Sequence, residues 1–72
     1  MGKIETMILS VMYKRTYLAP EQVRDYIQAK FGKMYYVDTI ARAIRRLHEK
    51  GLVKYGWFER DNSKYKKWVK EK

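Results

Sequence analysis

The sequence predicts a mostly helical α+β fold, in which three helices are followed by a two-stranded β-hairpin. Two observations support this prediction. Apolar residues recur at helical spacing in three successive stretches, at about residues 3–13, 20–31 and 38–50. After the third stretch, two segments rich in aromatic residues, about 52–60 and 64–70, flank the turn-forming sequence Asp61-Asn62-Ser63.

Length and composition limit the classes of function. The 72 residues suit one domain, 1–72, with a small core. Because the chain has no cysteine and one histidine, disulfides and thiolate metal sites are excluded, and we expect neither a metal nor a cofactor. Lys and Arg outnumber Asp and Glu 17 to 8, and the net charge of +9 predicts attraction to a polyanion.

The cellular location is also constrained by composition. No apolar stretch approaches the roughly 20 residues of a membrane span, and no targeting signal is visible. We therefore expect no membrane partner and a cytoplasmic location, on the nucleoid or inside a host cell. Few Asn and Gln residues beside many Lys and Arg residues are compatible with a thermophilic source.

The first two helices are predicted from their apolar stripes. The first stripe consists of Ile4, Met7, Ile8, Val11 and Met12, while Lys3, Glu5 and Ser10 fall outside it. The second consists of Val23, Tyr26, Ile27 and Phe31. Pro20 suits the first position of the second helix, and Gly32 suits the end of that helix. Leu18, in the connector before the second helix, is expected in the core.

The third helix carries the strongest pattern. Its inward face is predicted to contain Ile40, Ala43, Ile44 and Leu47, at positions i, i+3, i+4 and i+7. The rest of its surface carries Asp38, Thr39, Arg42, Arg45, Arg46 and Glu49. Arginine presents a rigid fork of donors that suits phosphates and the edge of guanine. We interpret this as a recognition helix; the alternative is an amphipathic helix with a solvated basic face.

The hairpin is predicted with two alternative registers. A two-residue loop at Asp61-Asn62 would place Phe58 opposite Tyr65, and a three-residue loop would place Phe58 opposite Lys66. Trp68 and either Trp57 or Phe58 should cover the helices.

Basic and polar residues gather near the predicted hairpin tip, and these are Arg60, Asn62, Lys64, Lys66 and Lys67. An extended basic tip can reach a nucleic-acid backbone, which is the hypothesis we favour; the alternative is a solvated loop. Of the two tyrosines before the third helix, Tyr35 and Tyr36, at least one should pack on the helices, and Tyr36 is a candidate backbone contact.

The order of elements resembles the winged helix-turn-helix family over nearly the whole chain. The best match is residues 38–53, which look like the third helix of that family and its Gly51-Leu52-Val53 exit into the hairpin, called the wing. Residues 18–23 look like the start of its second helix. The resemblance implies major-groove contacts at Asp38, Thr39, Arg42 and Arg46, and wing contacts between Arg60 and Lys66.

Together these features predict a sequence-specific double-stranded DNA-binding protein that regulates transcription. The alternative is a basic winged-helix module that binds a protein, RNA or single-stranded nucleic acid. An enzyme is not expected, because the four glycines are scattered and His48 has no catalytic partner in sequence. No small-molecule effector is evident.

We also expect a weak homodimer that is strengthened on DNA, because one recognition helix reads only a few base pairs. The first helix is the expected interface, and the ring-rich hairpin is the second candidate surface. The candidate residues are Met7, Val11, Met12 and Tyr13 in the first helix, and Tyr55, Trp57 and Trp68 in the hairpin.

Overall fold

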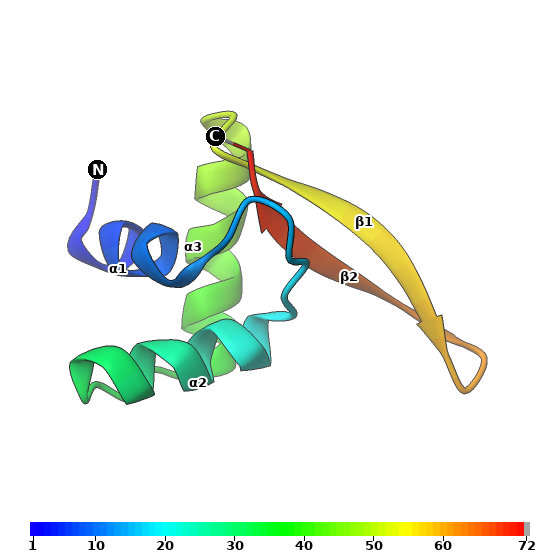
Figure 1. Ribbon diagram of the computed structural model, residues 1–72, viewed down its shortest axis with the longest axis horizontal. Helices are drawn as coiled ribbons and strands as arrows, with labels where there is room; N and C mark the ends of the chain where they lie inside the picture. The colour runs from blue at the N-terminus through cyan, green and yellow to red at the C-terminus, as the bar shows by residue number, and fades with distance from the viewer. Residues whose placement is uncertain (72) are drawn as a thin grey trace.

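The computed structural model describes residues 1–71, in which three helices are followed by a two-stranded antiparallel hairpin (Figure 1). The helices are α1 (Lys3–Val11), α2 (Pro20–Phe31) and α3 (Val37–Glu49). The strands are β1 (Val53–Arg60) and β2 (Ser63–Lys70). This order confirms the predicted α+β fold with mostly helical content.

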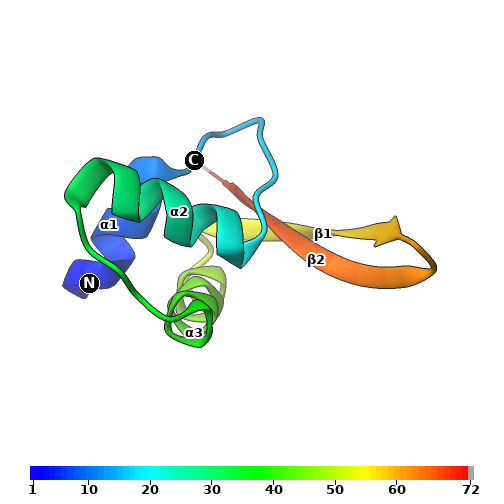
Figure 2. The ribbon, with the colours of Figure 1, turned by 90° about the horizontal axis from the view of Figure 1, so that it is seen from below.

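The helices form a bundle, and the hairpin projects from it as an arm (Figures 1 and 2). α1 and α2 pack against each other and against α3. Seen from below, α3 forms one edge of the bundle, with α1 and α2 on its other side (Figure 2). One long side of α3 is therefore left uncovered by the other helices.

The core lies between the helices and the base of the hairpin. Seven apolar side chains of the helices have no exposed surface, and these are Ile8, Val23, Ile27, Ile40, Ala43, Ile44 and Leu47. The predicted inward face of the third helix is thus confirmed. Val53 and Trp68 extend the core onto the hairpin, where both are buried.

Local sequence signals account for the ends of α2. Pro20 occupies the first helical position, where a missing N–H costs nothing, and the Ala19 N–H donates to Gln22 Oε1 at 2.9 Å. At the other end Gly32 adopts a left-handed φ of 67°, and its N–H donates to the Gln28 carbonyl oxygen at 2.9 Å. That conformation favours glycine because a Cβ would crowd the backbone.

The connector between α1 and α2 joins the hairpin to the bundle. The Leu18 N–H donates to the Trp68 carbonyl oxygen at 2.7 Å, and the Trp68 N–H donates to that of Leu18 at 2.8 Å. Leu18 is buried, as predicted. The base of β2 is therefore held on both edges, which restricts the angle at which the hairpin leaves the helices.

The hairpin takes the register of the two-residue loop. Asp61 and Asn62 have φ of 53° and 64°, and Phe58 pairs with Tyr65. Two consecutive positive φ values are the requirement of a tight turn whose twist matches that of the strands, and Asn and Asp tolerate them.

Several predicted details of the helices are wrong. The first helix ends at Val11, not at residue 13, because Met12 is already extended, with ψ of 149°. Tyr26 and Phe31 were expected in the apolar stripe of α2 but are exposed, since Val23 and Ile27 alone fill the space against the other helices. Glu5 was expected outside the apolar stripe of α1 but is buried.

The expected dimer surface on the first helix is also wrong in composition. Met7, Val11 and Met12 are each at most 6 % exposed, because they belong to the core of the single chain. Of the four side chains expected there, Tyr13 alone is exposed. On the hairpin, Trp68 is likewise buried, whereas Tyr55 and Trp57 are exposed.

Candidate nucleic-acid interface

The uncovered side of α3 presents two arginines that are not committed to acidic partners. Asp38, Thr39, Arg42 and Arg45 are all exposed. Within residues 1–71, none of the ion pairs involves Arg42 or Arg45. Their guanidinium groups can therefore donate to a ligand without first breaking an internal ion pair.

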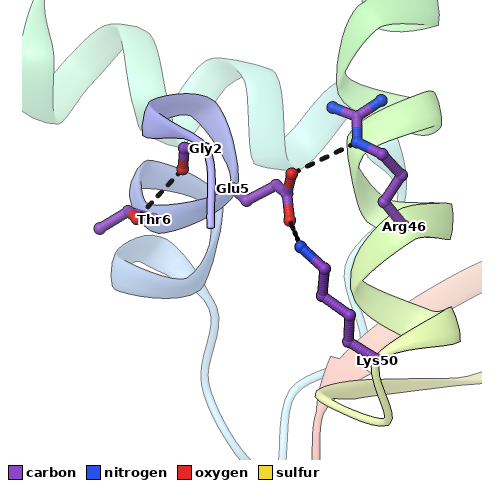
Figure 3. Close-up of polar contacts among 5 residues, drawn as sticks. All are labelled: Gly2, Glu5, Thr6, Arg46 and Lys50. Atoms are coloured by element: carbon purple, nitrogen blue, oxygen red, sulfur yellow. Dashed lines mark hydrogen bonds and ion pairs between the residues drawn. The ribbon is translucent and has the colours of Figure 1, made fainter.

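Arg46, the third arginine of this helix, lies in a different environment. Its Nε donates to Glu5 Oε1 at 3.3 Å, and Lys50 Nζ donates to Glu5 Oε2 at 2.6 Å (Figure 3). The Glu5 side chain comes from α1, so both cations are drawn toward that helix. Arg46 was predicted to contact DNA, and here it joins α1 to α3 while half of its side chain stays exposed.

Two cations stabilise Glu5 as a carboxylate. The hydrogen bond from Lys50 is the main reason that the pKa of Glu5 lies below its ordinary value of 4.5. Burial acts in the opposite direction, and the hydrogen bond from Arg46 lowers the pKa further. A buried carboxylate is tolerated when it is paired and hydrogen-bonded in this way.

The hairpin tip is basic and exposed. Arg60 Nε lies 4.0 Å from Asp61 Oδ2, and both side chains are more than 80 % exposed. A pair this exposed is worth little, so Arg60 can exchange Asp61 for another anion. Asn62 and Lys64 are exposed beside it.

One face of the hairpin carries an aromatic cluster around Lys66. The Lys66 Nζ lies 4.5 Å from the ring centroid of Tyr55, 5.2 Å from that of Trp57 and 5.8 Å from that of Trp68. At the base of the cluster, the His48 ring of α3 contacts Tyr55 and Trp68 edge-on. Lys66 was predicted as a backbone contact, and it lies on this face instead of at the tip.

A groove separates α3 from the hairpin. Its lining includes Ala41 and Arg45 of α3, and Trp57, Lys64 and Lys66 of the hairpin. Arg45 and two predicted hairpin contacts therefore border one concave surface. The helical pattern did not indicate Ala41 as a site residue. Its small side chain leaves space on the α3 side of the groove.

The two tyrosines before α3 lie in different environments. Tyr35 is half-buried against the core, as expected of at least one of them. Tyr36 is 85 % exposed at the N-terminal end of α3. Its hydroxyl is accessible to a nucleic-acid backbone that approaches that end of the helix.

Glu5 and Lys50 are the residues that pattern analysis missed on the bundle side. A signal was present, since Glu5 precedes Ile8 and Met12 by three and seven residues and so borders the apolar stripe. At the end of α3, Arg46 and the C-cap residue Lys50 are four apart and share one side.

Within residues 1–71, no group of three or more His, Cys, Asp or Glu residues is arranged to hold a metal ion. Over the same residues, each helix is too short or too polar to cross a membrane. No family model, curated protein or solved structure matches this chain.

Proposed function

We propose that this chain is a winged-helix protein that binds double-stranded DNA in a sequence-specific manner and regulates transcription. The observation that supports the proposal is the uncovered face of α3, where Arg42 and Arg45 are exposed and make no ion pair within residues 1–71. A single helix fits the major groove of B-DNA, and arginine can donate two hydrogen bonds to guanine.

The proposed contacts divide by position. Arg42 is in the middle of the free face of α3 and is assigned to base edges, with Asp38 and Thr39 one turn before it. Asp38 cannot attract phosphate, so its place on this face suits a base donor such as the cytosine amino group. Tyr36, Arg60 and Lys64 are assigned to the backbone, where contacts position the protein but carry little sequence information.

Arg46 is assigned mainly to the protein itself. Because Glu5 holds its Nε on the α1 side, Arg46 contributes to the orientation of α3 more than to base recognition. This departs from what the family resemblance implies for that position.

Selection of bound sequences from a random duplex pool tests the proposal. A defined motif is expected, and a pool without enrichment would overturn sequence specificity. Arg42→Ala should then cost about 1–3 kcal/mol on the selected duplex and relax base preference at one position. Arg24→Ala is the control, since Arg24 is on α2 and already pairs with Asp25 at 3.1 Å. Equal losses for Arg42→Ala on selected and scrambled duplexes would reduce Arg42 to a phosphate contact.

A further inference from the structure

We propose that the groove between α3 and the hairpin binds an unpaired nucleotide next to the duplex, with its base stacked on Trp57. This inference rests on the proposed function, because it adds a second feature of the same DNA ligand. It adds the ring of Trp57 to a groove that shares two cations, Arg45 and Lys64, with the proposed duplex contacts.

The exposure of Trp57 has no structural explanation in the fold. It is 61 % exposed, whereas the next residue, Phe58, packs against Tyr17 with ring centroids 5.4 Å apart. The hairpin face that carries Phe58 is thus covered by the α1–α2 connector. On the face that carries Trp57, the His48 ring contacts Tyr55 and Trp68 but not Trp57. A large exposed aromatic ring within a basic surface is typical of a binding site.

The ring of Trp57 has neighbours on two sides before any ligand binds. Lys66 Nζ lies 5.2 Å from the Trp57 centroid, and the Tyr55 ring meets Trp57 edge-on at 6.2 Å. Neighbours on two sides reduce the freedom of the side chain, so stacking on this ring is less opposed by entropy than stacking on a ring without neighbours.

Positive charge borders the ring of Trp57. The same groove is bordered by Arg45 from α3 and by Lys64 and Lys66 from the hairpin. A flat aromatic surface between cations matches a nucleotide, whose base stacks while its phosphate pairs with the cations. Ala41 leaves room on the α3 side, so a strand leaving a duplex held by α3 can enter the groove.

The test compares three forms of the selected duplex: blunt, extended on one strand by a short run of unpaired thymidines, and extended by the same number of paired residues. The paired extension controls for the added phosphates, and each strand is extended in turn. The unpaired extension on one strand should tighten binding about tenfold or more relative to the paired one. Equal affinities for paired and unpaired extensions would overturn the inference.

Matched variants assign the effect to the ring. Trp57→Ala should abolish the gain, and Trp57→Phe should keep most of it because a stacking surface remains. Phe31→Ala is the control for removal of an exposed ring outside the groove, and it should keep the gain. A gain that survives in Trp57→Ala would overturn the assignment.

Tryptophan fluorescence gives an independent measurement, since the chain has two tryptophans and Trp68 is buried. Unpaired thymidines should quench the parent more than Trp57→Phe, in which only the buried Trp68 of the groove lining remains; quenching as strong in Trp57→Phe as in the parent contradicts the inference. The proposed function fails by a different result, namely a blunt duplex that binds without dependence on Arg42. The two proposals can therefore fail separately.

Discussion

Neighbouring arginines on one helix can have different roles, and their acidic partners decide which. Arg42 and Arg46 are one turn apart on α3, but only Arg46 meets a buried carboxylate. The Glu5 carboxylate also takes Lys50, so one acidic residue engages two of the cations in and after the last turn of α3. The distribution of free positive charge on α3 is thus set by a residue of α1.

Glu5→Gln should destabilise the protein most at neutral pH. The pKa of Glu5 is lowered in the folded state, so its contribution to stability is full above the ordinary value of 4.5 and is lost as pH falls through the folded-state value. The difference in melting temperature between parent and variant should therefore shrink below about pH 4.5. Thermal unfolding followed across this range measures it.

Glu59→Gln is the matched control, because Glu59 is exposed and makes no ion pair within residues 1–71. It should change the melting temperature little at any pH. A Glu5→Gln difference that stays constant from neutral to acidic pH would mean that Glu5 acts through packing and not through its charge.

Gly51 follows the C-cap of α3 in a backbone conformation that favours glycine. Its φ of 75° is in the left-handed region, and nothing lies within 4 Å of a Cβ built there. Gly51→Ala should therefore cost about 1 kcal/mol of unfolding free energy through the backbone alone. Gly51→Asn should cost less, since asparagine tolerates this conformation. Denaturant titration would show the order Gly, Asn, Ala; equal stabilities would mean that the chain relaxes after α3.

Among the elements, α3 was the easiest to predict and the groove the hardest. The inward face of α3 follows from spacing alone, because Ile40, Ala43, Ile44 and Leu47 form one uninterrupted stripe that packs on two helices. The local pattern places Glu5 at the border of the apolar stripe, but it does not reveal the two ion pairs, because the partners of Glu5 are 41 and 45 residues away. The groove depends on the angle between the hairpin and α3, which the long-range Leu18–Trp68 pairing restricts.

The same contrast holds for the hairpin. Its existence follows from two aromatic-rich segments around a turn sequence, whereas the register depended on one residue of loop length. Asp61 and Asn62 decide it, since both adopt positive φ. A shift of one residue in register exchanges which of Trp57 and Phe58 shares a face with Trp68. Trp57 could therefore not be assigned to the α3 side from the sequence.

The two cations at the hairpin tip, Arg60 and Lys64, should act on DNA through their charge. Replacing Arg60 and Lys64 with Ala should weaken binding to selected and scrambled duplexes equally, because phosphate contacts carry no sequence information. The slope of log affinity against log salt should become shallower by about 0.9 for each phosphate that the variant no longer neutralises. Affinity measured over a series of salt concentrations gives both quantities.

Lys14 and Arg15 provide the control, since they are two exposed cations in the α1–α2 connector. Their replacement with Ala should alter the slope less. Asn62→Gly removes a candidate contact while keeping a turn that glycine accommodates, so any decrease in affinity reports the Asn62 side chain itself. An unchanged slope after replacement of Arg60 and Lys64 would mean that the hairpin points away from the DNA.

For the whole molecule, the arrangement of charge and apolar surface bears on self-association. The net charge of +9 opposes pairing of free copies, and DNA would screen that repulsion. Much of the surface first expected to pair is core, but a shallow groove between α1 and α2 is lined by Tyr13, Tyr26 and Lys30. Tyr13 and Tyr26 are exposed in this groove. One side of α3 is a separate surface, which α2 leaves uncovered (Figure 2).

We predict that two copies bind a twofold selected site, with contact through the Tyr13 and Tyr26 side chains, and that the free protein is mostly monomeric. One recognition helix covers only a few base pairs, so a second copy on an adjacent half-site adds affinity even when the protein contact is weak. Sedimentation of the free protein and of its complex with the selected duplex measures both states. Replacing Tyr13 and Tyr26 with Ser should reduce the cooperativity of binding, whereas Tyr36→Ser, outside that groove, should not. Saturation of the selected site at one copy per duplex would rule out the dimer.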